Sequence, residues 1–131
     1  MEKSEISIQL YTARKFEPYE NILNFFSQSG ITNIELFGLE SIDIDEFKTM
    51  MESANISSRS THVSFEALKD TQNVIDRAKK LEINHVIVPA PPARQDAEFK
   101  DTFQMDQGEW TTFGKNLSMY VDKFEDAGLN L

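Results

Sequence analysis

The feature that most constrains the fold is a step that recurs where each predicted helix ends. Four such steps share one form, in which an apolar residue follows a residue at the helix end: Gly30-Ile31, Asn55-Ile56, Glu82-Ile83 and Gly128-Leu129. Glycine and asparagine suit the left-handed backbone conformation that often ends a helix. A predicted strand follows each of the first three steps within a few residues. The chain is therefore expected to alternate strands with helices and to stop as a fifth strand begins.

Four strands are predicted from the pattern of polar and apolar residues. Residues 6–11 alternate between the two kinds, which is the period expected for a strand with two different faces. Residues 33–37 and 85–88 form further apolar-rich segments, and residues 58–63 give a weaker one. Pro89 is expected to end the fourth strand because proline cannot donate to the hydrogen-bond ladder.

Four helices are predicted from apolar residues at helical spacing. The first begins at Pro18, and the second begins at Asp43 with Glu46 three residues later, a pair that resembles a capping box. The third covers residues 71–81, with a separate short turn at residues 65–68. The fourth is expected from about Thr111, after a long irregular stretch over residues 90–108. Its buried side is expected to carry Phe113, Leu117, Tyr120, Val121 and Phe124.

Alternating strands and helices predict a parallel sheet, yet one face of these strands is polar. An open, doubly wound sheet would bury Glu35 under a helix without an obvious partner, which is costly for a carboxylate. A barrel would place it near a partly solvated mouth. The chain has 131 residues, about half of the ~250 of a complete eight-stranded barrel. We therefore predict an α/β fold, a parallel (β/α)4 half of a TIM barrel that forms a single domain over residues 1–131.

The polar positions near the carboxyl ends of these strands are candidate site residues. Gln9, Tyr11, Glu35 and His62 are expected there, and Arg14 lies in a loop that leaves the same end. Active sites of barrel enzymes collect at this end, so these side chains can converge on a ligand. The alternative, which the residues leave open, is that Glu35 pairs with a neighbouring cation and His62 caps the next helix.

Other conspicuous residues are interpreted as structural or peripheral. His85 begins its strand and is expected at the opposite end of the sheet, where residues serve stability. Trp110 precedes the last helix and is expected to anchor it, although it could line a pocket. Arg94 lies in a loop at the same end as the candidate site.

Composition excludes several classes of function. Thirteen lysines and arginines against 22 acidic residues give a formal charge of −9, which disfavours nucleic acid and anionic membranes as partners. The absence of cysteine excludes disulfides and thiolate metal sites. The N-terminus has no apolar targeting segment, and no apolar run approaches the ~18 residues that span a bilayer. We therefore expect a cytoplasmic protein.

Three segments together resemble the opening of the xylose-isomerase-like TIM barrels, most closely the sugar-phosphate isomerase/epimerase branch. They are IQLYTAR at residues 8–14, NIELFG at residues 33–38 with Gly30 before it, and THVSFEAL at residues 61–68. The resemblance implies that Gln9, Glu35 and His62 line a pocket for a small sugar or sugar phosphate. It also implies a divalent metal (Mn, Mg, Co or Zn) held by later strands, so no metal is expected for this chain alone. The apurinic endonuclease members of the family, which use a histidine near the position of His62 as a zinc ligand, are disfavoured by the acidic charge.

Three hypotheses follow. In the first, the chain is the N-terminal half of a metal-dependent sugar isomerase or epimerase, truncated and inactive alone. In the second, it is a half-barrel that forms a homodimer to complete the barrel and binds a small polar ligand without catalysis. In that case Glu35 and His62 of two copies face one mouth and are candidate metal ligands. In the third, it is a structural or interaction domain with a solvated polar face.

Overall fold

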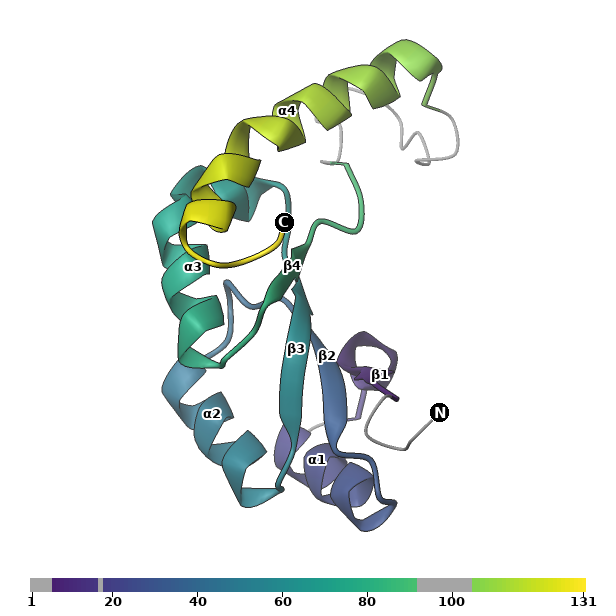
Figure 1. The fold of residues 1–131 in the computed structure, drawn as a ribbon. Coiled ribbons are helices and arrows are strands. Elements are labelled where there is room, and N and C mark those ends of the chain that lie inside the picture. Colours follow the sequence, from purple (N-terminus) through teal and green to yellow (C-terminus); the bar gives the residue numbers. More distant parts are fainter. Residues whose placement is uncertain (1–5, 17, 92–104) are drawn as a thin grey trace.

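A computed structural model describes residues 6–16, 18–91 and 105–131, over which strands and helices alternate (Figure 1). The strands are β1 (Ile8–Gln9), β2 (Asn33–Phe37), β3 (Ser57–His62) and β4 (His85–Ile87). The α-helices are α1 (Tyr19–Gln28), α2 (Ile44–Ser53), α3 (Thr71–Lys80) and α4 (Gln107–Asp126). Two short 3-10 helices, η2 (Leu10–Ala13) and η3 (Glu66–Asp70), follow β1 and β3.

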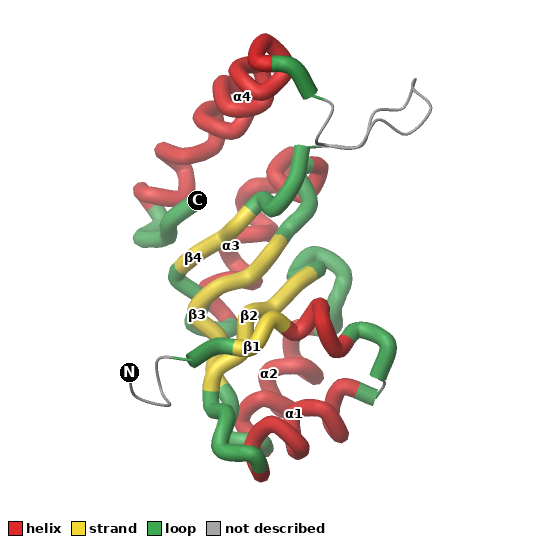
Figure 2. The backbone as a smooth tube through the Cα atoms, turned by 90° about the vertical axis from the view of Figure 1, so that its right-hand side faces the viewer, coloured by secondary structure: helices red, strands yellow, loops and turns green. Residues whose placement is uncertain are grey.

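The four strands form one parallel sheet in the order β1-β2-β3-β4, so each strand pairs with its neighbour in the sequence. Figure 2 shows helices α1, α2 and α3 on one side of this sheet and the strands open to the viewer on the other. No α-helix of the described residues covers this second side. We call the helix-covered side the outer face and the open side the inner face. The predicted half of a parallel α/β barrel is thus confirmed.

The hydrophobic core lies between the outer face and the helices. Side chains of alternate strand residues point into it, among them Ile34 and Leu36 of β2 and Val86 of β4, all buried. Leu23 of α1 and Val74 of α3 meet them from the helix side. Full burial of such a side chain is worth about 1.5–3 kcal/mol, so the outer face supplies most of the hydrophobic stabilisation.

The four helix ends predicted from the sequence share one geometry. In each, the residue before the apolar one has a left-handed backbone, with φ of 78° at Gly30, 54° at Asn55, 58° at Glu82 and 77° at Gly128. The apolar residue then donates its N–H to a carbonyl five residues back: Ile31 to Phe26, Ile56 to Met51, Ile83 to Ala78 and Leu129 to Phe124, at 2.8–2.9 Å. This is the hydrogen bond of the Schellman motif, which satisfies a helix carbonyl and turns the chain back toward the sheet.

The prediction that a fifth strand begins after the last helix is confirmed. Asn130 forms an isolated parallel bridge with His85 of β4. Its carbonyl accepts from Val86 N–H at 2.8 Å, and its own N–H donates to the Asn84 carbonyl at 2.9 Å. The chain therefore extends the sheet beyond β4 by one bridge.

The predicted first strand is too long. Only Ile8 and Gln9 pair with β2, and residues 10–13 turn as the 3-10 helix η2. Polar side chains hold this turn, because Thr12 Oγ1 donates to the Gln9 carbonyl at 2.7 Å and an Arg14 N–H donates to the Tyr11 carbonyl at 2.8 Å. Such side-chain bonds to the backbone compete with a strand ladder. Tyr11 therefore lies on the turn and not on the strand.

The last helix begins at Gln107, four residues before the predicted start at Thr111. A capping box explains the earlier start: Asp106 Oδ1 accepts from Glu109 N–H at 2.8 Å, and Glu109 Oε2 accepts from Asp106 N–H at 2.9 Å. Of the predicted buried side only Phe124 is fully buried, since the N-terminal half of α4 extends past the sheet (Figure 1). Trp110 packs against Phe113 with ring centroids 6.1 Å apart. No helix in the described ranges is both long and apolar enough to cross a membrane.

Candidate functional site

Three of the predicted site residues come together on the inner face of the sheet. Gln9 of β1 is the ladder partner of Glu35 in β2, and Glu35 is in turn the ladder partner of Ser60 in β3. His62 follows two residues after Ser60 on the same side of β3. Because the strands are parallel and adjacent, these side chains project to one face and meet.

Glu35 is the centre of a hydrogen-bonded network. Its Oε1 accepts from Gln9 Nε2 at 3.1 Å and lies 3.1 Å from His62 Nε2. Its Oε2 accepts from Ser60 Oγ at 2.9 Å. The side chains of His62 and Glu35 keep 19% and 23% of their surface exposed, so a ligand can reach them from the inner face. We call Gln9, Glu35, Ser60 and His62 the inner-face network.

The ring nitrogen of His62 that faces Glu35 is Nε2, and a proton on Nε2 can be donated to Glu35 Oε1 across 3.1 Å. The Gln9 amide nitrogen lies 3.2 Å from Nδ1 and 3.5 Å from Nε2, so it sits against the ring and not along the lone pair of either nitrogen. The Gln9 amide donates to Glu35 Oε1 at 3.1 Å. A carboxylate fixed beside an imidazole can hold and move a proton at a bound hydroxyl group.

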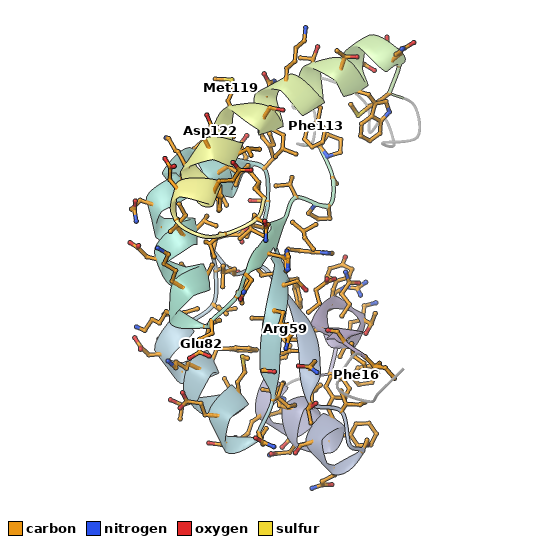
Figure 3. All side chains as sticks on the ribbon, viewed as in Figure 1. Phe16, Arg59, Glu82, Phe113, Met119 and Asp122 are labelled. Atoms are coloured by element: carbon orange, nitrogen blue, oxygen red, sulfur yellow. The ribbon has the colours of Figure 1, made fainter. Side chains whose placement is uncertain are left out.

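A β-bulge places Ser60 and His62 in the inner-face network. The β2–β3 register runs from Ile34 opposite Ser58 directly to Glu35 opposite Ser60, so Arg59 is the extra residue. Ser58 stabilises the bulge because its Oγ lies 2.8 Å from the Ile34 carbonyl and 2.9 Å from the Ser60 carbonyl. Without this extra residue in a bulge, the alternation would turn Ser60 and His62 toward the helices. Figure 3 labels Arg59 at the middle of the sheet, where it is exposed.

Tyr11 and Arg14 lie beside the inner-face network and not within it. The Tyr11 ring meets Phe37 edge-on, with centroids 5.2 Å apart, and the Arg14 guanidinium lies 3.9 Å from the Tyr11 ring centroid. Phe37 is the ladder partner of His62, which makes these aromatic rings a wall next to the network. Tyr11 stays 46% exposed.

The alternative interpretation of Glu35 and His62 holds in part, because Glu35 pairs with His62, which is a cation when it is protonated. Within the described ranges, the hydrogen-bond partners of Glu35 are Gln9, Ser60 and His62, and no lysine or arginine is among them. The short helix η3 after β3 has no side-chain cap, so His62 does not cap it. His85 instead contacts Asn130, whose Nδ2 lies 3.3 Å from His85 Nδ1. Arg94 lies outside the described residues.

Ser60 belongs to the site although the sequence does not single it out. Its place in the polar pattern of the third strand is the only signal, and the bulge that decides its direction has no sequence signature here. Serine is also common in turns and on solvated faces. The structure therefore adds Ser60 to the predicted set.

The described residues do not form a metal site. No group of three or more His, Cys, Asp or Glu side chains within the described ranges could hold an ion. Glu35 and His62 supply two donor groups that already bond to one another, whereas a zinc site takes three or four protein ligands. A divalent ion at this face would need further ligands.

Comparison with known proteins shows which solved structures share this fold. No protein-family model and no curated protein matches the chain. Solved structures do match, among them a sugar phosphate isomerase/epimerase from Parabacteroides distasonis, at 15% identity and a TM-score of 0.69 over 98% of this chain and 50% of that one. The IolI protein, whose structure carries a bound zinc atom, matches at 14% identity and a TM-score of 0.68 over 94% of this chain and 48% of that one.

A third match is a probable 3-DHS dehydratase, AsbF, from Bacillus anthracis, at 15% identity and a TM-score of 0.63 over 94% of this chain and 49% of that one. The chain thus spans about half the length of the solved structures it matches. At such identities the likeness concerns the fold alone. This chain has the fold of half of a TIM barrel, and the solved structures that share this fold include the sugar phosphate isomerase/epimerases that its sequence resembles.

Proposed function

We propose that the chain is the substrate-binding half of a sugar or sugar-phosphate isomerase or epimerase. The observation that carries this proposal is the inner-face network, in which Glu35 and His62 hold one another at 3.1 Å and remain partly exposed. The likeness in fold to sugar phosphate isomerase/epimerases supports the same class of ligand.

The chemistry of the inner face suits a polyhydroxylated ligand. Sugar hydroxyl groups both donate and accept hydrogen bonds, and the network offers carboxylate, amide and imidazole groups within one cluster. The rings of Tyr11 and Phe37 offer an apolar wall for the C–H groups of a sugar. The exposed guanidinium of Arg14 can bind a phosphate group, because its planar donors match phosphate oxygens.

Isomerisation next to a carbonyl also needs a Lewis acid or an equivalent electrophile, which a divalent metal supplies in this class of reaction. The described residues lack a complete set of ligands for one. We therefore expect the 131-residue chain to bind sugar without converting it. The role that we propose for this chain is to orient the ligand and to hold a proton at Glu35 or His62.

Binding can be tested by NMR titration of the chain with D-fructose 6-phosphate, with D-fructose and inorganic phosphate as separate probes. We expect shifts around Glu35 and His62 with both sugars, and the larger affinity with the phosphorylated one. Glu35→Gln should weaken binding about tenfold, since a charged acceptor becomes neutral. Glu125→Gln, the same change at an exposed position of α4, is the matched control.

Two results would contradict the proposal. One is a titration in which no resonance of the inner face moves with either sugar. The other is a Glu35→Gln variant that binds as tightly as the wild type.

A second candidate is self-association of two half-barrels around one small ligand. No large hydrophobic side chain is exposed on α2 or α3 within the described ranges. Those that are exposed lie on α1 and the segments around β1, at one edge of the sheet, or on α4, which follows β4 at the other edge: Ile6, Tyr11, Phe16, Phe25, Trp110 and Met119. Figure 3 labels Phe16 and Met119 at opposite ends of the molecule. A two-fold axis along the barrel would bring these ends together in an isologous dimer. Asn130 would then leave its place beside His85, because β1 of the partner takes that position.

Light scattering at micromolar concentration tests this candidate. A dimer that Phe25→Glu converts to monomers, while Lys79→Glu on the exposed surface of α3 leaves it intact, would support it. A monomeric wild type would exclude it. Sugar binding by a monomer would leave the first proposal standing.

A further inference from the structure

The loops that follow β2 and β3 are bonded to one another at the carboxyl end of the sheet. Gly38 N–H donates to the carbonyl of His62 at 3.0 Å. Two residues further along, Ser64 N–H donates to Glu40 Oε1 at 3.1 Å. The first bond ends on the carbonyl of His62, and the second begins two residues after His62. Gly38 and Glu40, which form the other side of these bonds, both belong to the loop between β2 and α2.

Arg77 of α3 fixes that loop on either side of Glu40. Its Nε donates to the Leu39 carbonyl at 2.8 Å, and its Nη2 donates to the Ile42 carbonyl. Leu39 is fully buried, which holds the loop against the core. The position of Glu40 is therefore set from α3, and Glu40 in turn holds Ser64.

The Glu40 side chain makes one hydrogen bond, to Ser64 N–H, at a cost in folding free energy. Its second carboxylate oxygen, Oε2, is buried and has no hydrogen-bond partner within the described residues. Burial of an unpaired polar atom lowers stability, and such atoms are rare enough in native proteins to require an explanation. An apolar side chain of similar size would avoid this cost. Stability alone does not account for a glutamate here.

We propose that Glu40 is a positioning residue for His62. Through Ser64 it fixes the backbone that leaves β3, and this backbone sets the direction in which the imidazole meets Glu35, 3.1 Å away. The inference rests on the proposed function for the meaning of the inner-face network, but the geometry it concerns exists without a ligand. The unpaired oxygen is then a loss of stability retained for the sake of the site, as often occurs where stability and activity compete.

The test is ¹⁵N NMR of the His62 imidazole in the ligand-free chain, with urea unfolding of the same samples. The wild type should show one dominant tautomer, protonated on Nε2. Glu40→Leu should shift both ring nitrogens toward an average of the two tautomers, while its urea midpoint stays equal to the wild type or rises. Glu40→Gln, which keeps an oxygen for Ser64 N–H, should restore the wild-type ring signals.

Glu125→Leu on the exposed side of α4 controls for the loss of a carboxylate and should leave the imidazole unchanged. Wild-type ring signals in Glu40→Leu would overturn the proposal. It would also fall if Glu40→Leu lowered the urea midpoint and Glu40→Gln failed to restore the ring signals, because Glu40 would then be a structural residue. A wild type that binds no sugar, with ring signals that still depend on Glu40, would refute the proposed function and leave the positioning role standing.

Discussion

The two faces of one sheet differ in what they require from the sequence. On the outer face, Ile34, Leu36 and Val86 are buried against helices. On the inner face, residues of the same strands keep about a fifth of their side-chain surface in water, as for Glu35 and His62. Neighbouring residues of β2 therefore have different roles, since Ile34 and Leu36 pack in the core and Glu35 faces the polar side. The outer face holds the fold together, and the inner face is left for polar groups that can meet a ligand.

The largest test of this contrast is Leu36→Ala on the outer face. Leu36 is 1% exposed, and removal of such a side chain from a packed core costs about 2–5 kcal/mol of unfolding free energy. Urea or thermal unfolding followed by circular dichroism measures the effect. A loss under about 1 kcal/mol would show that the outer face is not the main source of stability.

Glu35→Ala, one residue away on the inner face, should cost about 1 kcal/mol. The change removes three hydrogen bonds from the carboxylate, but water can reach the groups left behind, which reduces the penalty. The same unfolding experiment applies. If Glu35→Ala destabilised the chain as much as Leu36→Ala, the two faces would contribute equally and the contrast would fail.

The smallest effect is expected at the helix ends of the outer layer. Glu82 has a φ of 58°, a conformation that disfavours residues with a side chain. Glu82→Gly should therefore stabilise the chain by about 0.5–1 kcal/mol. Asn55→Gly, at a φ of 54°, should gain less, because asparagine tolerates this conformation. Equal gains at the two sites, or a loss at Glu82, would contradict this account of the helix ends.

Much of the outer architecture could be predicted from the sequence. Three of the four helix-end steps combine Gly or Asn with an apolar residue, the fourth has Glu82 in the first position, and all four have that geometry. Residues 33–37 match β2, and the separate turn after the third strand is η3. These features are local, since they depend on residues within one or two helical turns. Local features of this kind can be predicted from one sequence, because all the residues that determine them lie close together in the chain.

The parts that could not be predicted depend on contacts between distant segments. The bulge at Arg59 follows from the pairing of β2 with β3, and the strand pattern alone does not reveal it. The strand pattern gives Ser60 only as one polar position among several, and its contact with Glu35 depends on this pairing. The early end of β1 depends on how Thr12 and Arg14 bond to the turn backbone. Gln9, Glu35 and His62 could be predicted to meet because parallel strands place their carboxyl ends at one edge, whereas Tyr11 shifted out of the set with the turn.

The strand order has a consequence for how the protein forms during synthesis. Each strand pairs with the one made just before it, and Asn130 joins β4 in the same sense. Each βα unit can therefore dock on the growing sheet as it leaves the ribosome, without waiting for a distant partner. Pairing with the preceding strand limits the sequence separation of each new strand contact to about one βα unit, which is less than a sheet with distant strand partners would require. The sheet can be built vectorially, one unit at a time, and the inner-face network is complete once His62 and the residues just after it have emerged.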